Sequence, residues 1–301
     1  MTSPDKKDKI GFASQKRLKT AATYVVLLFF FAISIIPIFI VFITAFKTDA
    51  EMSLAAFRWL PADFTYMGNF EAALRMGNWP RYFWNTIIVT FFTLAGSLFF
   101  NSIAGYAFAK LKFYGRDFLF ILLLVGMMVS PQSVIIPQFI MMRSVPLAGG
   151  NDILGAGGVG LLNTYASLII PFLSGSFGIF LCRQFYSTIP DSLQEAAYID
   201  GSGPIRTYFY IYLPLSGTVL ATLTIFRTIA SWNDFFYPLI MTQTAGMRTV
   251  QLALQMFRGG TVTHYNHLMA ATLMTILPII IVYFFAQKFF VQGMASTGMK
   301  N

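Results

Sequence analysis

Long runs of apolar residues are the feature that most constrains how this chain can fold. A helix that crosses a bilayer needs about 20 mainly apolar residues. Six stretches meet that need, at 21–46, 86–109, 118–141, 165–186, 215–240 and 268–290. Of 301 residues, 56% are hydrophobic and only 11% are charged, whereas a soluble domain carries about 25% charged residues. We therefore expect an all-α, polytopic membrane protein with six transmembrane helices.

The distribution of Lys and Arg predicts how these helices are oriented. Cytoplasmic segments near transmembrane helices carry an excess of both residues. Thirteen of them lie in the N-terminal tail, after the second run, between the fourth and fifth runs and at the C-terminus, and seven lie between the other runs, so the excess comes mainly from the N-terminal tail. We expect a multi-pass protein of the cell (inner or cytoplasmic) membrane with both termini in the cytoplasm. The net charge of +9 then reflects topology and not a nucleic-acid partner.

The apolar runs also predict the organisation of the chain. The first run is too long for a signal peptide and lacks a small-x-small cleavage site, so we expect it to be retained. The expected order is a basic cytoplasmic tail at 1–20, a first transmembrane helix at 21–46, an extracytoplasmic loop at 47–82, a core at 83–291 with five transmembrane helices, and a cytoplasmic C-terminal tail at 292–301.

A polar island at 190–214 separates the fourth and fifth apolar runs. Pro190 can open a helix at its first turn, and Ser192 with Glu195 fits a capping box. Gly201 can end that helix in a left-handed conformation. A second short helix follows, so the island predicts a cytoplasmic helix-turn-helix.

The first helix of this island would present small residues. Ala196, Ala197 and Asp200 lie on neighbouring helical positions, and the two alanines would let another surface approach closely. The alternative is a surface loop that has no partner.

Several motifs of catalysis and cofactor binding are missing from the sequence. It contains no Gly-Lys pair, hence no phosphate-binding G-x-x-x-x-G-K-[ST] loop. Its two histidines, His264 and His267, have neither a carboxylate nor a cysteine close in sequence to complete a zinc site. We therefore expect a non-catalytic chain that holds no metal or cofactor of its own.

The polar island resembles a known family. Its pattern is Glu195-Ala196-Ala197, three residues, Gly201, nine residues, and Ile211-Tyr212-Leu213-Pro214. In full it resembles the cytoplasmic loop of ATP-binding-cassette (ABC) importer permeases. Two further stretches resemble the carbohydrate branch of that family, Trp232-Asn233-Asp234-Phe235 and residues 287–293. The chain is most similar to the second, shorter permease of a maltose-type system.

This resemblance implies a function and partners. The chain would be a permease subunit of a binding-protein-dependent importer for a carbohydrate, such as an oligosaccharide, a glycoside or a related polyol. A second homologous permease would complete the pathway, two ATPase subunits would bind ATP and Mg, and an extracytoplasmic binding protein would deliver the sugar. Glu195 and Asp200 would orient the docking helix, while Ala196, Ala197 and Gly201 would make close contact with an ATPase.

Two charged residues, Arg227 and Asp234, lie inside the fifth run. An ionisable residue in a membrane segment is a functional-site hypothesis by default. Seven residues of helix separate them by about 10 Å along the axis, so we do not expect a direct pair. With Trp232 and Asn233 they are candidates for the sugar pathway. The alternative is a polar cluster that anchors the helix at the bilayer interface.

Two other functions remain as alternatives. A stand-alone ion-coupled secondary transporter often has two repeated halves and midplane charges, but this chain has no apparent repeat and few such charges. A membrane-embedded enzyme would need clustered carboxylates, histidines or a nucleophile with its base, and the apolar runs carry no such cluster.

Overall fold

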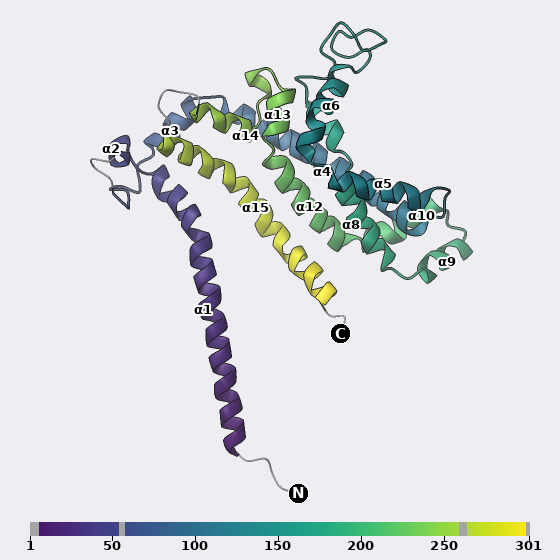
Figure 1. Cartoon of the computed structure of the whole chain (residues 1–301), viewed down its shortest axis with the longest axis horizontal. Helices are drawn as coiled ribbons and strands as arrows, with labels where there is room; N and C mark the ends of the chain where they lie inside the picture. Colours follow the sequence, from purple (N-terminus) through teal and green to yellow (C-terminus); the bar gives the residue numbers. More distant parts are fainter. Residues whose placement is uncertain (1–5, 54–57, 259–263, 299–301) are drawn as a thin grey trace. The chain divides into compact units, whose positions relative to one another are not determined.

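The computed structural model describes the backbone of residues 6–53, 58–258 and 264–298, and the side chains of 19–53, 58–258 and 264–284. All regular structure within these ranges is helical (Figure 1), which confirms the expected class. In the described part, four helical segments are long and apolar enough to cross a membrane: Lys19–Ala45, Trp79–Lys110, Tyr165–Ser187 and Tyr265–Phe284. Two bent helix pairs pass the same test together, so the number of candidate spans is four to six.

The chain divides into two compact units, residues 1–75 with 260–274 and residues 76–259 with 275–301. The first unit holds α1 (Lys6–Ala45), α2 (Asp49–Met52), α3 (Gly68–Arg75) and the start of α15 (Tyr265–Gly298). Helices α2 and α3 therefore lie inside the predicted outer loop. The motif at 287–293, the C-terminal tail and all of the basic tail except Lys19 and Thr20 lie outside the described side chains.

The buried core of the first unit is small and lies at the C-terminal end of α1. Ala45, Phe46 and Ala270 form its apolar cluster. The side-chain amide of Asn69 donates to the carbonyls of Ala45 at 2.8 Å and Lys47 at 2.7 Å. These bonds satisfy carbonyl groups that a helix C-terminus leaves without intrahelical partners.

Close packing of α4 (Trp79–Lys110) against α8 (Ser176–Ser187) forms the centre of the second unit, with α12 (Gly217–Trp232) beside them. A Cβ at Gly105 would lie 2.5 Å from Cβ of Cys182 and 2.9 Å from the backbone nitrogen of Arg183. Small residues permit this approach between membrane helices. Cys182 itself is fully buried.

The third predicted run is not one straight helix. It forms α5 (Arg116–Met128) and α6 (Pro131–Arg143), whose axes are bent by 106° at residues 129–130. Pro131 lacks an N–H and disfavours helical geometry in the residue before it, so the chain restarts there as a new helix. The predicted third span at 118–141 is therefore a helix pair broken before Pro131, and not one continuous helix.

The fourth and fifth runs are also interrupted. The fourth contains α7 (Tyr165–Ile169), the 3-10 turn η1 (Ile170–Phe172) and then α8. Asn101 accepts hydrogen bonds from the Ser174 hydroxyl and the Gly175 N–H at this break, so a neighbouring helix satisfies the freed backbone.

In the fifth run, α12 ends at Trp232 and α13 (Phe236–Met241) follows after three residues. The predicted helix over 215–240 is thus two helices.

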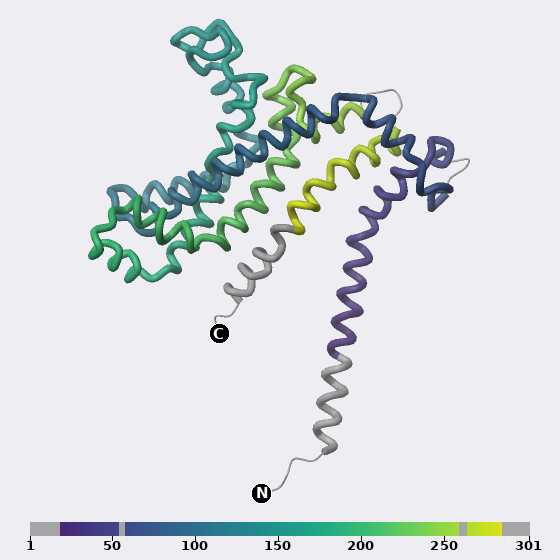
Figure 2. The backbone as a smooth tube through the Cα atoms, turned by 180° about the vertical axis from the view of Figure 1, so that it is seen from behind, coloured from purple at the N-terminus to yellow at the C-terminus, as the bar shows by residue number. Residues whose placement is uncertain are grey.

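Shorter elements complete the second unit. They are α9 (Ser192–Ile199), α10 (Pro204–Thr207), the π-helical turn η2 (Tyr208–Tyr212), α11 (Leu213–Leu215), η3 (Ala245–Met247), α14 (Val250–Ala253) and η4 (Leu254–Phe257). The glycine-rich loop between α6 and α7, teal at the upper left of Figure 2, folds back on itself. The amide of Asn151 holds it by donating to the carbonyls of Arg143 and Val145.

Candidate functional site

Local signals in the polar island build the predicted helix-turn-helix. Helix α9 ends in a Schellman cap, in which Ser202 N–H donates to Ala197 O at 2.8 Å and Gly201 N–H to Tyr198 O at 3.0 Å. Gly201 has φ of +77°, the left-handed conformation that such a cap requires. The predicted left-handed conformation of Gly201 is confirmed. Helix α10 then begins at Pro204.

The start of α9 differs from the expected capping box. Its N-cap residue is Asp191, and no side chain caps the helix there. The Asp191 carboxylate instead accepts a hydrogen bond from the Lys110 ammonium at the end of α4. That bond holds the pKa of Asp191 below its usual value. The capping box of Ser192 and Glu195 was therefore a wrong prediction, because an ion pair across 81 residues sets the start of α9.

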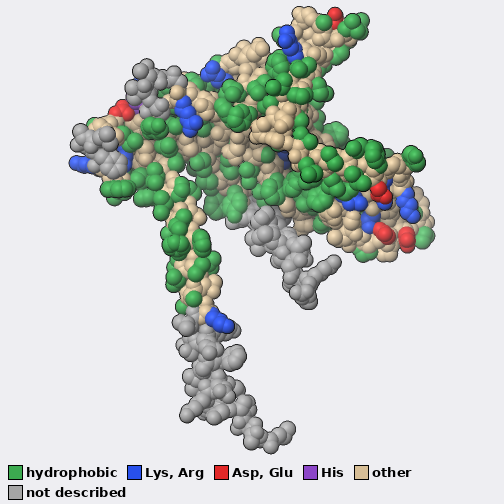
Figure 3. Space-filling model, in the orientation of Figure 1, with side chains coloured by type: hydrophobic (Ala, Val, Ile, Leu, Met, Phe, Trp, Pro, Cys, Tyr) green, Lys and Arg blue, Asp and Glu red, His purple; other side chains and the backbone are tan. Residues whose placement is uncertain are grey.

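The residues predicted to dock point in two directions. Glu195, Ala196, Asp200 and Gly201 are exposed, whereas Ala197 is buried against the chain's own core. The two alanines therefore do not share one open face. Lys, Arg, Asp and Glu side chains gather at the end of the second unit where α9 and α10 lie (Figure 3), so this end is suited to water.

Large apolar side chains nevertheless stand out at this charged end. Ile199 is 86% exposed, Ile205 71% and Tyr210 76%. Apolar groups that gather among charges mark interaction surfaces. Sequence reasoning missed these three residues, although Ile199 and Ile205 flank the glycine turn and could have been noticed there.

A chain of hydrogen bonds joins α9 to the membrane helices. Gln194 donates to the carbonyl of Lys110 at 3.2 Å and to the hydroxyl of Tyr198 at 2.8 Å. Its side-chain oxygen accepts from the Tyr212 hydroxyl at 3.3 Å. Gln194 is buried, so the inner face of α9 is bonded both to α4 and to η2.

The Ser216 hydroxyl, which bonds to the backbone carbonyl of Tyr212 at 2.5 Å, joins this chain to a buried group of hydroxyls. Tyr208 donates to Ser102 at 2.9 Å, Ser102 and Tyr186 are 2.7 Å apart, and Ser216 donates to Tyr186 at 2.8 Å. All four residues are buried. These bonds link η2 to α4, α8 and the start of α12, so the helix-turn-helix and three long helices share one polar network.

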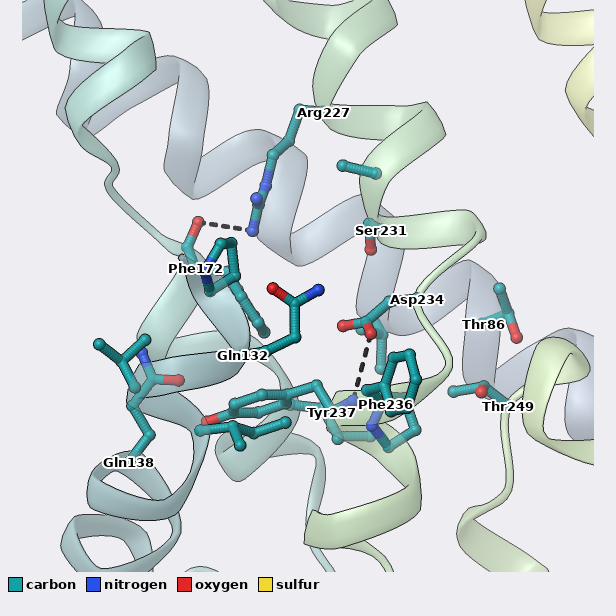
Figure 4. A pocket seen from close by; sticks show the side chains of 17 residues that line it. Thr86, Gln132, Gln138, Phe172, Arg227, Ser231, Asp234, Phe236, Tyr237 and Thr249 are labelled. Carbon is teal, nitrogen blue, oxygen red and sulfur yellow. Dashed lines mark hydrogen bonds between the residues drawn. The ribbon is translucent and has the colours of Figure 1, made fainter. Parts of the chain in front are cut away.

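A second site is a cavity of about 310 Å³ in the second unit. Side chains from α4, α6, η1, α12 and α13 line it (Figure 4). Gln132, Arg227, Ser231 and Asp234 lie around its central space. The two predicted pathway charges therefore face the same cavity, from the body of α12 and from the break that follows it.

Hydrogen bonding at the cavity is incomplete. Arg227 donates from Nη2 to Phe172 O at 3.0 Å, but its Nε has no partner. The hydroxyls of Tyr237 and Thr249 are likewise buried without a partner. Asp234 accepts from the backbone N–H of Tyr237 at 3.2 Å and forms no ion pair with Arg227 among the described residues, as the spacing predicted.

The other two predicted pathway residues lie elsewhere. Trp232 is 5% exposed and donates from its indole nitrogen to Thr275 O at 3.1 Å. Asn233 is exposed and accepts from Gln251 at 3.1 Å. Neither lines the cavity, because α12 ends at Trp232 and the chain turns there.

Sequence reasoning missed several cavity residues, among them Gln132, Gln138, Tyr237 and Thr249. A signal for the first two exists, since each glutamine directly follows a proline within an apolar run. Tyr237 and Thr249 carry no such mark, because only the fold brings them to the cavity.

Comparison with known proteins found a matching family model and relatives that are similar over most of the chain. The family model described as "binding-protein-dependent transport system inner membrane component" matches residues 101–296. The chain is 32% identical to the probable ABC transporter permease protein YurM of Bacillus subtilis, over 92% of this chain and 87% of YurM. It is 28% identical to the arabinooligosaccharides transport system permease protein AraQ of Halalkalibacterium halodurans, over 89% of this chain and 92% of AraQ.

A solved structure has the same fold. It is a chain from a crystal structure of a bacterial ABC transporter involved in the import of the acidic polysaccharide alginate. The TM-score is 0.75 at 24% identity, and the match covers 96% of this chain and 100% of that one.

Proposed function

The chain belongs to the family of binding-protein-dependent transport system inner membrane components, and we propose that it is a permease subunit of an ABC importer for a carbohydrate. As a member of that family it is a multi-pass membrane subunit. The carbohydrate assignment takes its support from AraQ, whose name states arabinooligosaccharide transport. The cargo would be an oligosaccharide, a glycoside or a related polyol.

The proposed topology has six spans and both termini in the cytoplasm. Each bent pair, α5 with α6 and the segment 204–215 with α12, then counts as one broken span. The charged end that carries α9 and α10 would face the cytoplasm, in agreement with its Lys and Arg residues. The glycine-rich loop after α6 would face the outside.

The proposed partners follow from the family. A second homologous permease would form the other half of the pathway, two ATPase subunits would bind ATP and Mg, and an extracytoplasmic binding protein would deliver the sugar. This chain would be a non-catalytic subunit without a cofactor of its own, and the missing phosphate-binding loop agrees with ATP hydrolysis by the partner subunits.

One observation carries the coupling mechanism: α9 is exposed on one face and bonded to the membrane helices on the other. Glu195, Ala196 and Gly201 would meet an ATPase subunit, with exposed Ile199 and Ile205 beside them. Gln194 and the buried tyrosine hydroxyls would then carry the closing of the ATPase pair to α4, α8 and α12. Alternating access of the pathway would follow.

Two substitutions test the docking surface in the full transporter. Glu195→Lys reverses a charge on α9, and Gly201→Leu puts a bulky side chain on the turn. Both should abolish uptake while the protein stays in the membrane. Glu71→Lys, at an exposed carboxylate of α3, is the matched control and should transport normally. Undiminished uptake and ATPase coupling in both docking variants would disprove the docking role.

The alternative of an ion-coupled transporter has its own test. The purified chain alone, in liposomes with a proton or sodium gradient, should not accumulate sugar if the proposal holds. Accumulation under those conditions would favour the alternative.

A further inference from the structure

We propose, building on the function above, that the cavity between α6, α12 and α13 is a binding site for one or two rings of an uncharged saccharide and excludes acidic sugars. The inference adds both the place where the cargo binds and its charge class.

Three unpaired polar atoms point to a hydroxylated ligand. In the described part of the chain, four buried side-chain polar atoms lack a hydrogen-bond partner, and three of them belong to Arg227, Tyr237 and Thr249, which all line this cavity. A buried group left without a partner costs about 1–3 kcal/mol, so such groups are rare in native proteins. These three atoms are themselves sealed from the cavity space, but their side chains line it. With a small rotation each could pair with a hydroxyl of a ligand, since a hydroxyl both donates and accepts.

The charge of the lining selects against anions. Among the side chains that line the cavity, Arg227 is positively charged and Asp234 is negatively charged. The other polar groups in the lining are amides and hydroxyls. The cavity is therefore balanced in charge. A carboxylate or phosphate in this cavity would be attracted by Arg227 and repelled by Asp234, so the lining gives it little net compensation for the hydration that it loses on entry. A neutral saccharide can donate to Asp234 and accept from Arg227.

Size and aromatic content fit the same ligand. A cavity of about 310 Å³ lies at the lower end of the range for small-molecule sites, about 300–1,000 Å³. Phe172, Phe236 and Tyr237 contribute aromatic rings to the lining, and the rings of Phe172 and Tyr237 are 4.6 Å apart. Apolar ring faces together with a few convergent polar groups are typical of ligand pockets.

Arg227 also lines a second cavity, of about 280 Å³, with Ser97, Asn101 and Ser174. The first cavity lies toward the Asp234 end of α12, and the second extends along α12 as far as Leu223. A saccharide that leaves the first cavity would therefore meet further polar groups next to Arg227. The two cavities share Phe172, Arg227 and Ala230 in their linings, and neighbouring polar cavities suit a pathway better than one isolated void does.

The test uses the complete transporter, with its partner subunits, in liposomes. Ser231→Cys introduces a thiol into the cavity lining, and a membrane-permeant maleimide reports its accessibility. The native Cys182 is fully buried, and the unsubstituted transporter gives its background labelling. The probes are neutral arabinose and glucose oligosaccharides of one to three rings and alginate oligosaccharides of the same lengths. Uptake of each probe is measured in parallel.

We expect a transported neutral saccharide to slow labelling of Ser231→Cys at least fivefold, and the alginate oligosaccharides to leave it unchanged. In a Ser231→Cys/Asp234→Asn double variant, protection should extend to an acidic probe, because the repelling carboxylate is gone. Asn233→Ala, next to Asp234 but outside the cavity, should leave the selectivity as it is.

The outcomes separate the inference from the proposed function. Failure to take up any saccharide of either class would count against the carbohydrate function itself. Uptake of a neutral saccharide that gives no protection would overturn the binding site. Uptake of an acidic probe that protects the cysteine as well as a neutral one does would overturn the charge selection.

Discussion

Under the proposed function, replacing Gly201 by alanine isolates the contribution of one backbone conformation to docking. Gly201 has φ of +77°, and a Cβ built on it would meet nothing within 4 Å. Alanine therefore causes no clash, and its cost comes from the left-handed conformation alone, about 1–2 kcal/mol. Gly203, two residues later, also has open space around it, but its φ is −75°, which alanine adopts without strain.

The expected effect on coupling follows from that energy. A penalty of 1–2 kcal/mol lowers the ratio of capped to uncapped α9 by about 5- to 30-fold. The apparent affinity for the ATPase subunits falls by up to the same factor where the capped form becomes the minor one. Gly201→Asn should lose less, because asparagine tolerates the left-handed region. Gly203→Ala should bind normally.

The assay is the affinity of the ATPase subunits for the permease pair in detergent, supported by uptake in liposomes. We expect the order wild type, Gly201→Asn, Gly201→Ala from strongest to weakest, with Gly203→Ala equal to wild type. Equal affinities for Gly201→Ala and Gly203→Ala would refute the argument from the backbone. A weaker Gly201→Asn than Gly201→Ala would do the same.

Three further predictions concern contacts among α4, α8 and the helix-turn-helix at 190–214. Gly105→Ala places a methyl group against Cβ of Cys182 at 2.5 Å, so the tight helix pair must move apart. Thermal unfolding in detergent should show a loss of about 1–3 kcal/mol, and an unchanged melting temperature would contradict it. Ser102→Ala removes the hydroxyl between two buried tyrosines and should cost about 1–3 kcal/mol, measured in the same way; an unaltered stability would show that the network is dispensable. Because Lys110 lowers the pKa of Asp191, their bond should stabilise the segment fully above about pH 4, near the usual carboxyl pKa, and lose this effect as the pH falls through the lowered pKa. Asp191→Asn should therefore differ from wild type in thermal stability at pH 6 and converge with it at strongly acidic pH, and a constant difference would contradict the assignment.

Much of the helix-turn-helix at 190–214 could be predicted because its signals are local. The glycine turn after α9 depends on a few adjacent residues, and Gly201 has the predicted conformation. The start of α9 could not be predicted in the same way. Asp191 bonds to Lys110, far away in sequence, and this contact replaces the expected cap.

The membrane helices show a similar limit. Hydropathy averaged over some 20 residues detects the length of an apolar segment but not the interruptions within it. The segments on either side of the breaks before Pro131 and after Trp232 were therefore predicted as single apolar runs. The ends of these helices decide which side chains meet. Trp232 and Asp234 are two residues apart, yet only Asp234 reaches the cavity. The position of Tyr237 in that cavity depends on packing that no local pattern encodes.

The sharing of Arg227 by two cavities has a thermodynamic consequence. If ligands in both cavities bonded the same N–H of this guanidinium, occupancy of one cavity would weaken binding in the other. This linkage is reciprocal by necessity, with coupling free energies commonly about 1–3 kcal/mol. Two sugar rings in line would thus disfavour each other, and the entry of one would help to release the next.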